Sequence, residues 1–82
     1  MKLELYQRVS LSRDVPEFRL QRGDVAILID YVPHPGSGEE GCILEIFNAL
    51  GESIRVVTVP VSTVEPLRAD EVMTVRSIAQ PA

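Results

Sequence analysis

The chain has 82 residues, 45% of them hydrophobic and 24% charged, and its formal net charge is −4. This length and composition predict one small globular domain over residues 1–82, with a single core. The acidic balance disfavours a nucleic-acid module, because such domains usually carry an excess of lysine and arginine.

The first predicted element is a half-buried strand over residues 2–12, where apolar and polar side chains alternate. Its first residues, 3–6, fit a short helical lead-in equally well. Pro16 ends the alternation, since it has no N–H to donate to a neighbouring strand. Residues 14–21 then form a loop whose apolar side chains cover one end of the core: Val15, Phe18 and Leu20.

A turn at Gly23 and Asp24 leads into the most apolar stretch, residues 25–32, which predicts a central strand. We assign its faces from Asp30, because a carboxylate is rarely buried without a partner. This assignment puts Val25, Ile27, Ile29 and Tyr31 inside, and Ala26, Leu28, Asp30 and Val32 outside.

Two prolines and three glycines predict a mobile surface loop over residues 33–41. The next strand covers residues 42–47, and a tight turn at 48–51 with Gly51 in the left-handed conformation joins it to a strand over 53–59. Alternation places Cys42, Leu44 and Ile46 inside. The facing of residues 53–59 is ambiguous from the sequence.

The last part of the chain predicts a helical or 3₁₀ turn over residues 61–67 and an edge strand over 71–78, followed by a frayed tail at 79–82. Five short strands, tight turns and one short helical turn before the last strand predict a small all-β barrel. A barrel would remove most exposed strand edges by closing on itself.

Five short motifs resemble a family of small bacterial proteins of unknown function. They are Glu-Leu-Tyr-Gln-Arg-Val at 4–9, Arg-Asp-Val-Pro at 13–16, Gly-Asp-Val-Ala at 23–26, Val-Thr-Val-Pro at 57–60 and Glu-Pro-Leu at 65–67. The resemblance implies an SH3-like barrel and, more distantly, a relation to the KOW-type modules of translation and transcription proteins.

The resemblance also implies a two-protein system, in which the gene lies beside one for a larger toxin-like or nuclease-like protein. The chain departs from the family pattern at Ala26, where the family has glycine, and at Val59, where it has leucine. Ala26 argues against a ligand that needs close approach to the backbone at that point.

No catalytic arrangement is recognisable. His34 is the single histidine, in the proline-rich loop, where a solvated side chain is a better interpretation than a metal ligand. Cys42 is the single cysteine and is interpreted as a small core residue. We therefore expect no enzyme, no metal and no cofactor. The first residues lack the apolar segment of a signal peptide, which favours a cytoplasmic protein.

The sequence favours a protein-interaction module, and together with the resemblance it suggests an antitoxin-like or immunity-like inhibitor whose acidic charge suits a basic enzyme as partner. The expected binding surface is an outward apolar patch formed by Leu28, Val32, Ile43 and Phe47. The alternative is nucleic-acid binding through Arg8, Arg13, Arg19 and Arg22, although solvated arginines beside acidic neighbours are the simpler interpretation. A homodimer through residues 71–78 is a further expectation.

Overall fold

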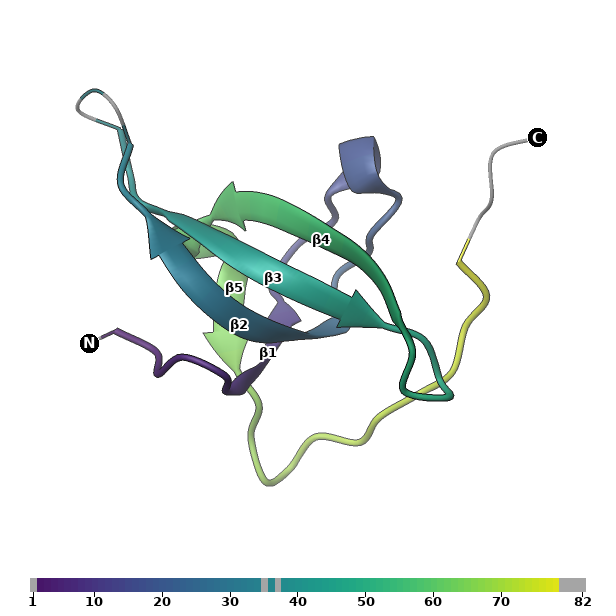
Figure 1. Ribbon diagram of the computed structural model, residues 1–82. Helices are drawn as coiled ribbons and strands as arrows, with labels where there is room; N and C mark the ends of the chain where they lie inside the picture. Colours follow the sequence, from purple (N-terminus) through teal and green to yellow (C-terminus); the bar gives the residue numbers. More distant parts are fainter. Residues whose placement is uncertain (1, 35, 37, 79–82) are drawn as a thin grey trace.

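The chain folds into one five-stranded antiparallel sheet with two short 3₁₀ turns, in a computed structural model that describes residues 2–34, 36 and 38–78 (Figure 1). The strand order is β4-β3-β2-β1-β5, so the first strand lies between the second and the fifth. An all-β fold is therefore confirmed. The elements in chain order are β1 (Arg8–Leu11), η1 (Pro16–Phe18), β2 (Val25–Val32), β3 (Gly41–Phe47), β4 (Ser53–Pro60), η2 (Val61–Thr63) and β5 (Val64–Pro66).

The sheet is not closed. Each of its two outer strands, β4 and β5, pairs with one neighbour, β3 and β1 respectively, and in the described part of the chain they do not pair with each other. The long strand β4 consequently keeps one free edge, which a closed barrel would have removed.

The two ends of the sheet differ from the sequence prediction. The first strand begins only at Arg8, because Tyr6 adopts a left-handed backbone with φ of 67° and interrupts the extended chain before it. The fifth strand is β5, which begins directly after η2 and pairs with β1. Residues 71–78 form no strand, so the predicted edge strand there is wrong, and the tail 79–82 lies outside the described residues.

The three central strands match their predicted positions closely. Strand β2 has the expected bounds, and β3 and β4 each extend the expected range by one residue. Gly51 has φ of +85° in the β3–β4 turn, which confirms the left-handed position assigned to it, and Gly23 has φ of +92° in the turn before β2. Local turn chemistry was therefore sufficient to place both connections.

The predicted facing of β2 is wrong over most of the strand. Ala26 and Leu28 are buried, whereas Ile27 and Ile29 are only half-buried and lie outside the core cluster. The register against β3 shifts between Leu28 and Asp30, so β2 carries a β-bulge there. A bulge reverses the in–out alternation, and Tyr31 beyond it packs against the core as expected.

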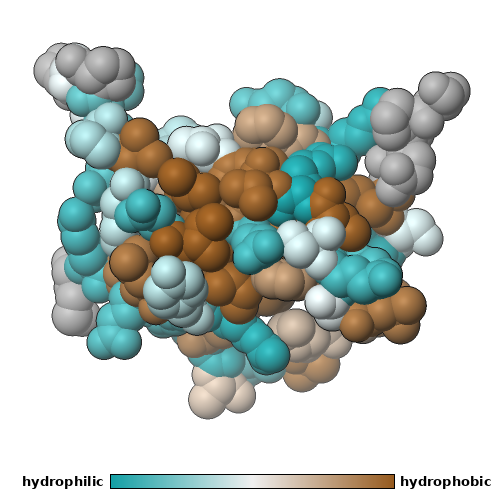
Figure 2. Space-filling view, viewed as in Figure 1, coloured by the Kyte–Doolittle hydropathy of each residue, from teal (hydrophilic) through white to brown (hydrophobic). Residues whose placement is uncertain are grey.

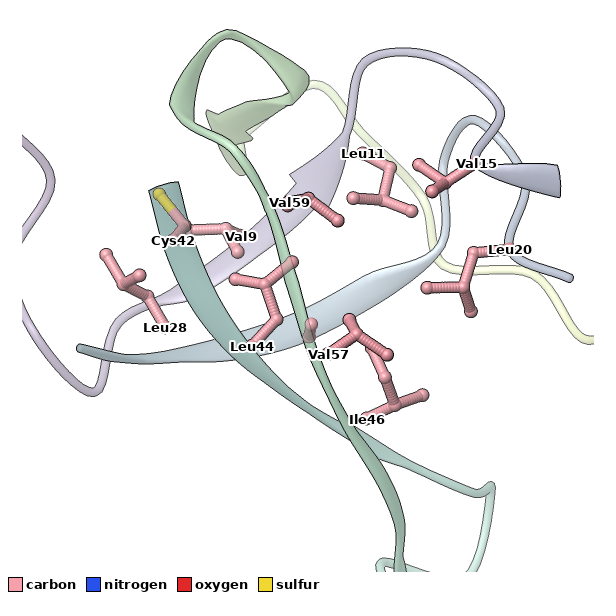
Figure 3. Close-up of a cluster of buried hydrophobic side chains, with 11 residues drawn as sticks. Val9, Leu11, Val15, Leu20, Leu28, Cys42, Leu44, Ile46, Val57 and Val59 are labelled. Atoms are coloured by element: carbon pink, nitrogen blue, oxygen red, sulfur yellow. The ribbon is translucent and has the colours of Figure 1, made fainter. Parts of the chain in front are cut away.

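The core lies between the front layer of β2, β3 and β4 and the strands β1 and β5 that cross behind it (Figures 1 and 3). Figure 3 shows that side chains from β1, β3 and β4 point into one space, and that Val15 and Leu20 close one end of it. This confirms the inward facing of Cys42, Leu44 and Ile46, and it resolves the ambiguity in β4, where Val57 and Val59 point inward.

Candidate protein-binding face

The side of β2, β3 and β4 that points away from the core carries a group of apolar side chains. Five of them form what we call the outer face: Ile27, Ile29, Ile43, Phe47 and Val56. The three isoleucines from β2 and β3 are half-buried without joining the core cluster, and Val56 is 55% exposed and Phe47 38% exposed. Figure 2 shows apolar surface gathered over these strands, with hydrophilic side chains around it.

Strand register builds the outer face from neighbouring side chains. Ile27 lies opposite Glu45, and Glu45 in turn lies opposite Val56, which gives one continuous row across three strands. A second row joins Asp30, Ile43 and Thr58. Directly opposed side chains on one face of a sheet are close enough to touch, so the apolar groups form a contiguous surface.

Two carboxylates lie in these rows. Glu45 accepts a hydrogen bond from the hydroxyl of Ser53 at 2.6 Å, and Asp30 accepts one from the backbone N–H of Tyr31 at 2.8 Å. Both bonds are local and leave lone pairs of each carboxylate free for another donor. The outer face therefore combines apolar contact area with negative charge, and its nearest cation in the same row is Arg8, opposite Ile27.

The four residues expected to form the binding patch are only partly brought together. Ile43 and Phe47 belong to the outer face, and Val32 lies at the end of β2 opposite Gly41. Leu28 is fully buried in the core, so its place in the patch is wrong. Sequence reasoning missed Ile27 and Ile29 because of the bulge. It missed Val56 because consecutive β-branched residues in β4 hide the alternation.

The four arginines of the alternative function do not gather on one face. Arg8 and Arg22 line a shared hollow, whereas the Arg13 guanidinium donates to the hydroxyl of Thr63 at 3.0 Å and Arg19 lies at the end of η1. The hollow that Arg8 and Arg22 line also carries carboxylates: Asp24, Glu65 and Glu71. A surface of mixed sign gives little of the counterion release on which phosphate binding depends.

The remaining candidate groups lie apart from the outer face. The ring nitrogen Nδ1 of His34 accepts hydrogen bonds from the N–H groups of Gly36 at 3.0 Å and Gly38 at 3.3 Å. Within residues 2–34, 36 and 38–78, no three histidine, cysteine, aspartate or glutamate side chains are grouped so as to hold a metal ion. No helix in this part of the chain has the length and apolar character that crossing a membrane requires.

Cys42 is fully buried, as expected. Burial raises the pKa of its thiol above the ordinary value, and the carboxylates of Glu40 and Glu39 raise it further. The reactive thiolate is therefore disfavoured in the folded protein.

We expect Cys42 to react with a disulfide reagent such as dithionitrobenzoate at least about 100-fold more slowly in the native state than in urea, because reaction requires opening of the core. The variant Cys42→Ala with Leu50→Cys is the control, since Leu50 is 85% exposed and a cysteine there reacts freely. Equal rates for the native wild-type protein and this control would show that Cys42 is accessible.

No protein-family model, curated protein or solved structure matches this chain. The resemblance to the small bacterial family therefore stays a prediction, and functional inference depends on the geometry of the chain itself.

Proposed function

We propose that this protein is a non-catalytic protein-interaction module, and that it inhibits a basic toxin-like or nuclease-like enzyme encoded beside it. The observation that supports this proposal is the outer face, where five large apolar side chains on three adjacent strands are left outside the core. Apolar side chains gathered on one face of a small domain are typical of a partner surface.

We further propose that the fold is an SH3-like barrel that remains open along one side. The strand order, with β1 between β2 and β5, and the 3₁₀ turn η2 directly before the last strand support this proposal. In such an arrangement β1 and β5 cover the core from behind and leave the outer face of β2–β4 free to bind.

The charge of the outer face supports a basic partner. Glu45 lies between Ile27 and Val56, and Asp30 lies opposite Ile43, so a docked lysine or arginine would meet a carboxylate beside an apolar contact. The net charge of −4 adds a long-range attraction that speeds encounter with a cationic protein.

The test uses the full-length chain and the purified product of the adjacent gene in isothermal titration calorimetry. Replacing Ile43 by arginine puts a cation in the middle of the outer face, and we expect it to weaken binding at least about tenfold. The matched control is Leu50→Arg at the tip of the β3–β4 turn, which makes the same charge change away from the outer face and should leave affinity within about twofold of wild type. The variant Ile43→Val should bind nearly as well as wild type.

Three outcomes would contradict the proposal: no binding by the wild-type protein, equal loss in Ile43→Arg and Leu50→Arg, or unchanged activity of the enzyme in the complex. An electrophoretic gel shift at low salt tests the alternative function, nucleic-acid binding, with the same protein. Binding of a DNA or RNA duplex that falls steeply with salt, and that is lost on replacing Arg8 and Arg22 by glutamine, would favour the nucleic-acid function instead.

A further inference from the structure

Residues 68–78 leave the sheet after β5 and form an extended arm that joins no strand of the described part of the chain (Figure 1). The arm is rich in residues that favour strands, yet the backbone groups of 72–78 make no hydrogen bond to any other described backbone group. Three apolar side chains in its middle are exposed, Val72 by 87%, Met73 by 60% and Val75 by 90%, whereas Ile78 at its end is partly buried against the core. The arm therefore has the composition of a strand without a sheet to join.

Polar contacts hold the arm in place at two points, and Ile78 at its end packs against the core. At its start, the backbone N–H of Arg68 donates to Glu71 Oε1 at 2.6 Å, and the N–H of Glu71 donates to the carbonyl of Arg68 at 3.1 Å. Near its end, the guanidinium of Arg76 pairs with the carboxylate of Asp24, with Nε and Oδ1 2.9 Å apart. Residues 71–75 between these two points are thus held extended before any partner binds, which lowers the entropy cost of pairing.

Strand β4 offers the complementary feature, an edge without a neighbour. It is 8 residues long and, among the residues that the structure describes, pairs on one side only, with β3. Charged side chains on natural edge strands usually prevent pairing with another chain. The charged residue of β4 is Arg55, and its guanidinium donates to the carbonyl of Phe18 in η1. The outward positions opposite Glu45 and Ile43 are Val56 and Thr58, which are uncharged, so no charge on β4 opposes an incoming apolar strand.

We propose that two copies of this chain form a symmetric dimer, in which residues 71–75 of each copy add to the free edge of β4 in the other. Within one molecule the arm does not pair with its own β4. Arg76 ties it to Asp24 at the start of β2, and a hollow of about 1220 Å³ separates it from the sheet. The occupant of the edge is therefore the arm of a second copy.

The position of the arm makes the exchange reciprocal. Ile54 at the start of β4 and residues 71–76 of the arm line the same hollow, and Figure 1 shows the arm passing beside the β3–β4 turn. Donor strand and acceptor edge are thus neighbours in each molecule, and one two-fold axis brings both pairs together. Pairing at this edge would place Val72, Met73 and Val75, which are exposed in the single chain, beside β4 and would leave the outer face open.

Sedimentation velocity of the full-length protein over about a hundred-fold range of concentration tests this proposal, and we expect a monomer–dimer equilibrium. The variant Met73→Pro removes a backbone donor in the middle of the arm and should weaken self-association at least about tenfold. Met73→Val keeps the donor and a strand-favouring side chain, and should dimerise like wild type. Because Met73 is exposed and unpaired in the single chain, both variants should fold, which circular dichroism will show.

Amide hydrogen exchange then identifies the edge that is used. In the wild-type dimer, amides on the free side of β4 should become protected together with those of residues 71–75, and Met73→Pro should lose both effects. A monomer at all concentrations, or a Met73→Pro dimer as strong as wild type, would overturn the proposal. Protection of the arm without protection of β4 would also overturn it, because that pattern indicates pairing of two arms.

Discussion

Replacing Leu28 by alanine is expected to lower the free energy of unfolding by about 2–5 kcal/mol, whereas replacing Ile27 by alanine should lower it by roughly 1 kcal/mol or less. The two residues are neighbours in β2, but they lie on opposite sides of the sheet. Leu28 is fully buried in the core cluster, and Ile27 is half-buried on the outer face. Truncating Leu28 leaves a cavity that surrounding atoms fill only in part, and truncating Ile27 leaves none.

Urea unfolding followed by circular dichroism measures both changes. If Leu28→Ala is too unstable to give a folded baseline, Leu28→Val and Ile27→Val make the same comparison with smaller losses. A larger loss for the Ile27 variants would mean that β2 faces the other way and that the bulge between Leu28 and Asp30 is misplaced.

The second large effect concerns Asp24, whose carboxylate has two roles. It accepts the backbone N–H of Gln21 at 2.7 Å, which closes the turn before β2, and it pairs with the guanidinium of Arg76 on the arm. The pKa of Arg76 is raised mainly by this hydrogen bond with Asp24, so the pair favours the charged guanidinium. Asp24→Ala removes both roles and should cost about 2 kcal/mol of stability.

Asp24→Asn separates the two roles, because the amide oxygen still accepts from Gln21 while the negative charge is lost. We expect it to cost about 1 kcal/mol, and we expect this loss to disappear when Arg76 is already replaced by glutamine. Urea unfolding at concentrations where the chain is monomeric supplies the four free energies of this double-mutant cycle. Additive losses would show that Asp24 and Arg76 do not interact in solution.

Local signals in the sequence were sufficient for the central part of the fold. Gly23 and Gly51 take the positive φ that their turns require, and the apolar runs between the turns became β2, β3 and β4 at nearly the predicted bounds. These features depend on short-range chemistry, which a single sequence contains.

The sequence was insufficient to predict which side chains of β2 face the core, because one extra residue changes the facing of the residues before it. Asp30 does lie outside, as argued from its charge, but the bulge between Leu28 and Asp30 breaks the alternation that was extended from it to the rest of β2. This single shift buried Leu28 and exposed Ile27, and so changed the composition of the binding surface. The residue types at 28–30 do not predict a bulge.

The fifth strand shows a second limit. Residues 71–78 have a stronger strand pattern than residues 64–66. The fifth strand nevertheless forms at Val64–Pro66, because the turn η2 directly before it places that segment beside β1. Pairing in a sheet depends on which segment the tertiary structure places beside a free edge, and local propensity does not decide this. The strand pattern at 71–78 remains without a partner in the single chain, which is the basis for the proposed dimer.

The most direct test of the proposed function is a cross-saturation NMR experiment on the isotope-labelled chain bound to the product of the adjacent gene. The outer face predicts that the strongest intensity losses fall on the amides of Ile27, Ile29, Ile43, Glu45 and Val56, with little change at the turn around Leu50 and in η1. Losses concentrated at Arg13, Arg19 and Arg22 instead, or spread evenly over the surface, would contradict a partner-binding role for the outer face.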